Sequence, residues 1–136
     1  HIYLTGNEIS DGGAMAIGEA LKTNKTITNV DVAWNRISDD GIIAIAEGMM
    51  SNTTLTYIRL SWNHMSHIGA RALAEALKIS KTITRINLSN NQMSDDGAKA
   101  IAEALRIDRS IVHLDLERNR ISDIGARAMA DALSVN

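Results

Sequence analysis

Apolar residues follow two different spacings, which alternate along the chain. Around Val30 and Val32 they alternate with polar residues, which is the period of a strand with one buried face. Over residues 98–105 they fall instead at positions i, i+3, i+4 and i+7, which is the period of a helix with one apolar stripe. The basic unit is therefore a strand followed by a helix.

This unit recurs at a fixed period of 28 residues. Two columns of identical residues mark it: Asn7, Asn35, Asn63, Asn91 and Asn119, and Gly13, Gly41, Gly69, Gly97 and Gly125. No linker or low-complexity segment interrupts the array. We therefore interpret residues 1–136 as one domain of about five repeats.

Repeated strand–helix units predict a parallel sheet with crossover helices, which places the chain in the α/β class. Parallel strands that are covered on both faces are apolar throughout, whereas these strands alternate, so we expect helices on one face only. Strands stack about 4.8 Å apart and helices roughly 8–10 Å apart. The array must therefore bend into an arc, with the sheet on its concave side and the helices on its convex side.

The motif inside each unit is specific. The strand half of the third repeat reads Leu55-x-x-Ile58-x-Leu60-x-x-Asn63-x-Met65, and the helix half of the fourth is Gly97–Leu105. The motif and the repeat length resemble those of leucine-rich repeat proteins of the ribonuclease-inhibitor-like subfamily, a group that includes ribonuclease inhibitor, the sensing arms of NOD-like receptors, the Ran GTPase activator and the tropomodulins. The resemblance covers essentially the whole chain. It implies a horseshoe-shaped solenoid, a cytoplasmic location and protein binding along the concave face, but it does not decide among the family's tasks.

Residues that recur in every repeat are expected to build the fold. An asparagine side chain can satisfy backbone groups left open where a strand turns, and in the resembled family it forms such a ladder. Ser94 before Asp95-Asp96 predicts a helix N-cap followed by acids that complement the helix dipole. Departures from the family pattern are Ile42, Met49-Met50, and His67 where other repeats have an aspartate.

Outward strand positions, together with the position before each asparagine, vary between repeats and form the candidate binding surface. They include Tyr3, Asp31, Trp34, Tyr57, Arg59, Trp62, Arg85, Asn87, His113, Asp115, Glu117 and Arg118, and all four aromatic residues of the chain are among them. Exposed Trp, Tyr and Arg dominate binding hot spots, so we expect a protein or peptide partner here. The alternative is that Trp34 and Trp62 stack on each other and contact no partner.

Charge also varies along this surface. The pattern places Arg59 and Arg85 next to each other in the middle, and Asp115 and Glu117 toward the C-terminal end. Such a gradient would orient a partner and would contribute more to specificity than to affinity. The alternative is that these charges are only solvated.

Composition narrows the classes of function. With a net charge of −2 and no cysteine, the chain has no basic field for nucleic acid, no disulfide and no thiolate. No apolar run approaches the roughly 18 residues of a membrane helix. His64 and His67 lack further ligands at metal-binding spacing, and Asp39-Asp40-Gly41 lacks the rest of a calcium loop. We therefore expect no catalytic residue, cofactor, metal, nucleic acid or membrane partner.

Neither end has the polar cap of a complete array, so we expect a fragment of a larger array, or self-association through the ends. Apolar residues at outward or terminal helix positions would support a lateral contact if they cluster; they are Ile43, Met50, Ile68, Ile79, Ile107 and Ile124. The leading hypothesis is the recognition segment of a larger intracellular protein. The alternatives are a GTPase-regulating arm, from the resemblance to the Ran GTPase activator, and a structural or self-assembling spacer.

Overall fold

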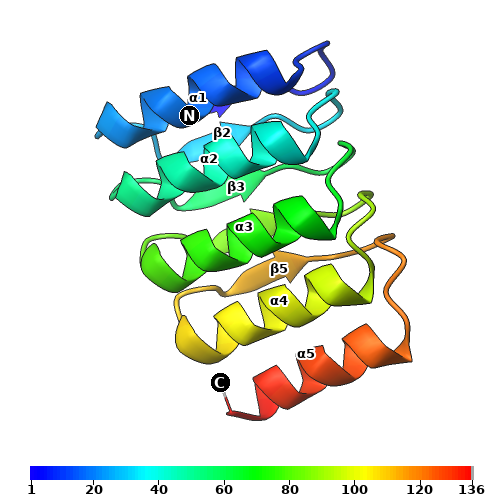
Figure 1. Ribbon diagram of the computed structural model, residues 1–136. Coiled ribbons are helices and arrows are strands. Elements are labelled where there is room, and N and C mark those ends of the chain that lie inside the picture. Colours follow the sequence, from blue (N-terminus) through cyan, green and yellow to red (C-terminus); the bar gives the residue numbers. More distant parts are fainter. Residues whose placement is uncertain (136) are drawn as a thin grey trace.

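The computed structural model describes residues 1–135, which form five strand–helix units. In chain order the elements are β1 (Ile2–Tyr3), α1 (Asp11–Thr23), β2 (Asn29–Asp31), α2 (Asp39–Ser51), β3 (Tyr57–Arg59), α3 (His67–Ile79), β4 (Arg85–Asn87), α4 (Ser94–Ile107), β5 (His113–Asp115) and α5 (Asp123–Val135). The strands pair in parallel in the order β1-β2-β3-β4-β5, each shifted by one repeat from its neighbour. All the helices lie in one layer on one face of this sheet (Figure 1). The predicted α/β solenoid is confirmed.

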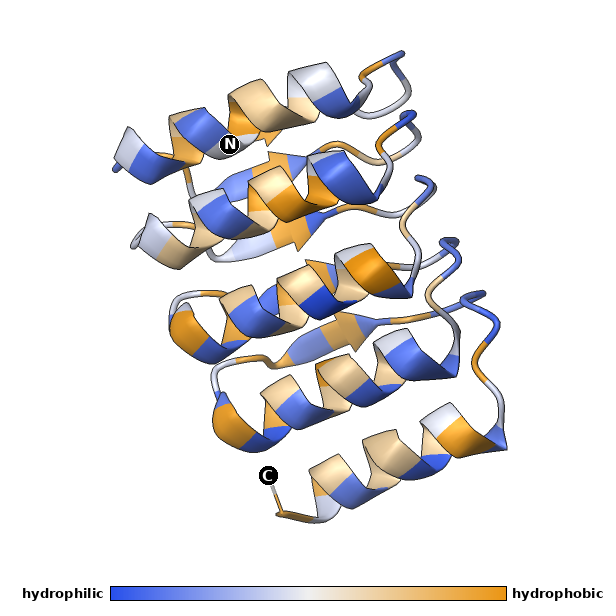
Figure 2. Ribbon diagram, viewed as in Figure 1, coloured by the Kyte–Doolittle hydropathy of each residue, from blue (hydrophilic) through white to orange (hydrophobic). Residues whose placement is uncertain are grey.

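The core lies between the sheet and the helix layer. The central residue of each inner strand, such as Val30, Ile58 or Ile86, is fully buried and pairs with its equivalent in the next strand. Helix residues such as Ile45 and Leu73 close the core from the other side. Apolar and polar residues alternate along the strands and wind around the helices in Figure 2, as the two spacings of the sequence predict.

Four of the five asparagines in the column, all except Asn7, are buried, and their role is structural, as predicted. The Asn63 Oδ1 atom accepts the Ile37 backbone N–H of the preceding repeat at 3.0 Å. Its Nδ2 group lies 3.0 Å from the Val32 carbonyl oxygen of that repeat and also contacts two carbonyls of its own strand turn. Asn35, Asn91 and Asn119 make the equivalent bonds. Each of these four asparagines therefore joins its repeat to the one before it.

A second column of hydrogen bonds runs along the helix starts. The Asp39 carboxylate accepts the backbone N–H and the hydroxyl of Ser66, and the backbone N–H of Gly69. Asp11 and Asp95 bind the next repeat in the same way. Hydrogen bonds from Ser122 lower the pKa of Asp95. This carboxylate therefore stabilises the fold above the unfolded aspartate pKa, and its contribution is lost as the pH falls through the lowered folded pKa.

His67 interrupts this second column, and the helix of the following repeat starts differently. Ser94 lies in the left-handed region with φ of 58°, and its backbone N–H donates to the Asn119 carbonyl oxygen instead of to a carboxylate. The predicted N-cap at Ser94 is therefore wrong, because α4 begins at Ser94 itself and no side chain caps it. Ser66 does cap its helix, by accepting the Ile68 backbone N–H.

Replacing His67 with aspartate is expected to stabilise the protein by about 1–2 kcal/mol, because Ser94 and Gly97 would donate up to three charge-assisted hydrogen bonds to the carboxylate in place of the weaker bonds that their N–H groups now make to the Asn119 and Met93 carbonyls. Urea unfolding of the variant and the native chain measures the difference. His64→Asp is the control, since it adds the same charge on an exposed neighbour outside the column. Equal stabilities of the H67D variant and the native chain would contradict the explanation.

Helices α1 and α2 lie closer together than they could if Gly18 and Gly48 carried side chains. A Cβ atom built on Gly18 would lie 2.2 Å from the Ala44 carbonyl oxygen, and one built on Gly48 would lie 2.3 Å from the Gly18 carbonyl oxygen. Other repeats carry alanine at both positions. The two glycines therefore allow backbone to lie against backbone between α1 and α2.

Candidate functional site

The face of the sheet away from the helices carries two rows of side chains that cross the strands. The register places Tyr57, Arg85 and His113 side by side in the first row. The second row joins the third strand positions: Tyr3, Asp31, Arg59, Asn87 and Asp115. Because every helix lies on the opposite face, these rows are the surface on which the sequence-predicted site residues meet (Figure 1).

Asp31 is the exception, because it is only 7% exposed. Its Oδ1 atom accepts the Ala33 backbone N–H at 3.0 Å, and its Oδ2 atom lies 3.4 Å from Arg59 Nη1. The exposed position predicted for Asp31 is therefore wrong, since its carboxylate holds the strand end and the neighbouring Arg59; its part in binding a partner stays a prediction. Ala33, Ser61 and Ser89 are also buried, where the strands turn toward the asparagine column.

The two central arginines differ in how much of their charge is free. The sequence pattern places Arg59 next to Arg85, but the register pairs Arg59 with Asp31 and Asn87 instead. The two arginines are therefore not cross-strand neighbours. Arg59 binds the Asp31 carboxylate and donates from Nε to Ser61 Oγ at 3.0 Å. Arg85 is exposed, and its guanidinium has no hydrogen bond or ion pair within residues 1–135. The middle of the face therefore presents one free guanidinium.

Tyr57, Arg85, Asn87 and His113 line an open hollow of about 380 Å³. Burial raises the pKa of Tyr57, and the nearby Asp31 charge raises it further, so the hydroxyl remains a donor at neutral pH. Asn87 is held in place, because its Nδ2 donates to Asp115 at 2.8 Å and its Oδ1 accepts from Ser89. A guanidinium, a phenol and an imidazole thus converge on one space, an arrangement suited to a carboxylate or a phosphate.

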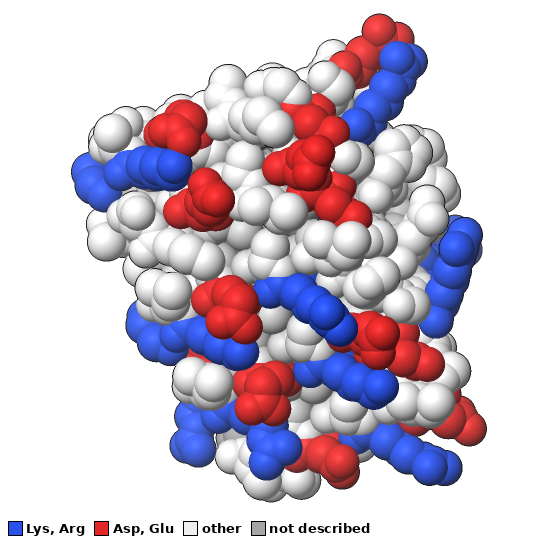
Figure 3. Space-filling model, in the orientation of Figure 1, with Lys and Arg blue, Asp and Glu red and all other residues white. Residues whose placement is uncertain are grey.

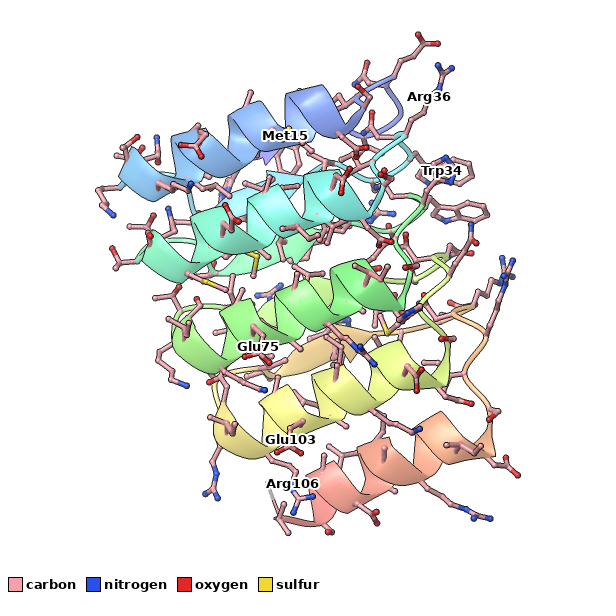
Figure 4. The ribbon with its side chains drawn as sticks, in the orientation of Figure 1. Met15, Trp34, Arg36, Glu75, Glu103 and Arg106 are labelled. Carbon is pink, nitrogen blue, oxygen red and sulfur yellow. The ribbon has the colours of Figure 1, made fainter. Side chains whose placement is uncertain are left out.

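The two tryptophans lie at the loop edge of the sheet, where Figure 4 labels Trp34. Their rings stack, with centroids 4.0 Å apart and planes inclined by 16°, yet Trp34 is 49% and Trp62 38% exposed. The two rings therefore do stack on each other, and exposed ring surface remains for a partner. Both residues have φ near +55°, as do Asn90 and Arg118 in the same column.

Of the residues in this column, only Gly6, with φ of 73°, is of a type that indicates a left-handed turn from the sequence. Changing Trp34 and Trp62 together to glycine is expected to alter the free energy of unfolding by less than about 1 kcal/mol. Glycine relieves the positive-φ cost, which offsets the lost stacking. Thermal and urea unfolding measure this. A loss of about 3 kcal/mol or more would mean that the pair is part of the core.

The remaining predicted residues lie at the ends of the face. Tyr3 is exposed on the edge strand, with its ring 6.1 Å from that of His1. At the other end, Arg118 Nε lies 3.4 Å from a Glu117 carboxylate oxygen, and both side chains are exposed. Asp115 accepts from Asn87 and from the Glu117 backbone. The predicted charge gradient is thus weakened, because Arg59 is paired with Asp31 and Glu117 with Arg118.

No group of three His, Asp or Glu side chains within residues 1–135 is placed to hold a metal ion. Neither is any helix of this range long and apolar enough to cross a membrane.

Comparisons with known proteins agree with this geometry. The family described as "Leucine Rich repeat" matches residues 1–18, 23–46, 51–74, 80–102 and 108–130, which together make up most of the chain. The chain belongs to the leucine-rich repeat family. A search of curated proteins with this leucine-rich repeat sequence finds no match.

Two solved structures have a similar leucine-rich repeat fold. One is "Leiomodin-1 Actin-Binding Site 2 (ABS2)", with a TM-score of 0.86 and 22% identity over 98% of this chain and 78% of that one. Another is the tropomodulin C-terminal domain of Caenorhabditis elegans, with a TM-score of 0.76 and 16% identity over 97% of this chain and 83% of that one. At these identities the likeness shows a shared fold and leaves the side chains of the binding face to be judged by themselves.

Proposed function

We propose that this chain is a non-enzymatic binding module that holds a protein or peptide on the open face of its sheet. The observation that carries the proposal is the free guanidinium of Arg85 in a hollow between Tyr57 and His113. An exposed arginine flanked by aromatic rings is the kind of residue that anchors a protein interface. The stacked tryptophans at the edge of the face add exposed aromatic surface.

The chemistry of the hollow favours an acidic group on the partner. Donors line it, and Asp115 lies outside its lining with one carboxylate oxygen bound to Asn87. An aspartate or glutamate side chain, or a C-terminal carboxylate, would receive hydrogen bonds from Arg85 and Tyr57 together. Charge-assisted hydrogen bonds of this kind fix the orientation of the bound segment.

Actin is the first partner to test. The reason is the fold that this chain shares with the actin-binding site 2 of leiomodin-1, a match that extends over 98% of this chain. Binding of the chain to monomeric actin by fluorescence titration is the direct measurement. An unbiased affinity capture from a cell lysate extends the test to other proteins.

The variant that tests the face is Arg85→Glu, which reverses the free charge. We expect it to weaken binding of the partner by roughly tenfold or more. Arg71→Glu is the matched control, because Arg71 is an exposed arginine on α3, in the helix layer, and the change in charge is the same. A partner that binds the wild type, R85E and R71E equally well would refute the concave face as the binding surface.

Two alternatives have their own tests. The GTPase-regulating arm rests on family resemblance, and GTP turnover by a small GTPase with and without the chain tests it.

Self-association is favoured by an apolar hollow at the α4–α5 end, where Val112 is 85% exposed; its lining is Leu105, Ile111, Val112, Leu114, Met129 and Leu133. Sedimentation at several concentrations, with Val112→Lys for comparison, tests that alternative, and a monomer at all concentrations would exclude it.

A further inference from the structure

The helix layer carries a sequence change that divides the array in two. At one outward helix position the five repeats have Met15, Ile43, Arg71, Lys99 and Arg127. Four residues later every repeat has an acid: Glu19, Glu47, Glu75, Glu103 and Asp131. In α3, α4 and α5 the cation and the acid are therefore one helical turn apart and of opposite charge. In α1 and α2 the cation is replaced by an apolar side chain, so the acid loses this neighbour.

The exposed members of this column lie on the outer side of the helix layer. Figure 4 shows Met15 on the outer side of α1, and Glu75 and Glu103 on the outer sides of α3 and α4. Met15 is 45% exposed, and Ile43 is partly exposed. The other predicted lateral residues do not join them, because Ile68, Ile79, Ile107 and Ile124 are on α3, α4 and α5, and Met50, at the end of α2, packs against the core.

Between α1 and α2 the two apolar side chains form part of a groove. It is an open hollow of about 420 Å³ lined by Met15, Glu19, Asp40, Ile43, Ala44 and Glu47. Its apolar lining comes from both helices, which Gly18 and Gly48 bring together. Glu19 lines the groove from α1, and Asp40 and Glu47 line it from α2. The result is an apolar surface with acids supplied by both helices.

The charge of this half of the helix layer is strongly acidic. Helices α1 and α2 contain five acids, namely Asp11, Glu19, Asp39, Asp40 and Glu47, and one lysine, Lys22. Lys22 is shared between Glu19 and Glu47, at 2.5 and 3.8 Å, and no cation within residues 1–135 lies within ion-pair distance of Asp40. Figure 3 shows acidic side chains gathered over α1 and α2, whereas Lys and Arg are interleaved with acids over the other helices.

We infer that this groove is a second docking surface, which receives a basic amphipathic helix from a protein partner. Apolar side chains of that helix pack on Met15, Ile43 and Ala44, while its lysines and arginines lie against Glu19, Asp40 and Glu47. A helix with an apolar stripe flanked by cations matches an apolar surface flanked by acids, which is the usual form of helix-in-groove recognition. The surface lies on the opposite side of the array from the Arg85 hollow, so the inference is independent of the concave-face proposal.

The probe for this inference is a synthetic helical peptide of about 15 residues with a leucine stripe and lysines elsewhere. Fluorescence anisotropy measures its affinity, and NMR chemical shifts of the labelled protein locate it. Met15→Arg with Ile43→Lys restores the cations of the other repeats, and each new cation lies one turn before an acid, so the fold is kept. We expect the double variant to bind the peptide roughly tenfold more weakly, through lost apolar contact and added positive charge.

Two controls separate the groove from general attraction between opposite charges. Ile79→Lys with Ile107→Lys adds the same charge at exposed helix residues outside the groove and should weaken binding far less. A second peptide, with alanine in place of leucine and the same lysines, should bind more weakly than the first. An equal loss in the two double variants, equal affinity of the two peptides, or shift changes confined to the open sheet face would each overturn the inference.

Discussion

Replacement of Asn63 by alanine is expected to destabilise the protein by about 3–5 kcal/mol. The Asn63 amide makes hydrogen bonds with four backbone groups. Water does not reach these groups, because Asn63 and the residues that carry them are buried within the strand turns. Without it the Ile37 N–H loses its acceptor, and the Val32 and Leu60 carbonyls lose a donor. A buried donor left without a partner costs its full desolvation energy, which is why the effect exceeds that of one ordinary hydrogen bond.

The measurement is urea unfolding followed by circular dichroism, with Asn7→Ala as the matched control. Asn7 stands in the same column, but it is exposed, and within residues 1–135 its side chain donates hydrogen bonds only to Leu4 and Thr5 of its own repeat. Its loss is expected to cost less than about 1 kcal/mol. If N63A and N7A proved equally mild, the column would not be what joins the repeats.

Gly18→Ala is expected to have the second-largest effect, a loss of about 2–3 kcal/mol. Alanine ordinarily favours a helix, but here its Cβ would meet the Ala44 carbonyl oxygen and carbon and the Ile45 nitrogen, all of them backbone atoms. Backbone cannot rotate away as a side chain can, so α1 and α2 must separate. The cost is the packing lost when they do.

Gly12→Ala is the control for this variant, because Gly12 is in the same helix and a Cβ there would contact nothing within 4 Å. We expect G12A to be neutral or to stabilise by about 0.5 kcal/mol through helix propensity. Thermal unfolding of the two variants compares them directly. A stable G18A variant would mean that the helices can move apart without loss.

The repeat architecture could be predicted from the sequence because it depends on spacing. The 28-residue period and the change from alternation to helical spacing fix the strand, the helix and the covered face. The asparagine ladder followed from the same period and from family resemblance. These features recur in every repeat, so a single local exception does not obscure them.

The candidate site was less predictable, because it depends on conformations of single residues. Alternation along a strand assigns Asp31 to the open face, but not the rotamer with which it accepts the Ala33 N–H and pairs with Arg59. The cross-strand neighbours of Arg85 are Tyr57 and His113, each 28 positions away in the sequence. To identify them, the strands must be aligned residue by residue, and not only repeat by repeat. The left-handed turn at Trp34 could not be inferred from tryptophan, which rarely adopts it.

The interruption at His67 has a consequence for how the array comes apart. At the other three interior seams an aspartate clamps the next repeat with three hydrogen bonds, whereas the seam between the third and fourth repeats has none of this kind within residues 1–135. Linear arrays lose structure where neighbouring units are most weakly coupled. We therefore expect unfolding to separate the array most readily between the third and fourth repeats, into one block of three repeats and one of two.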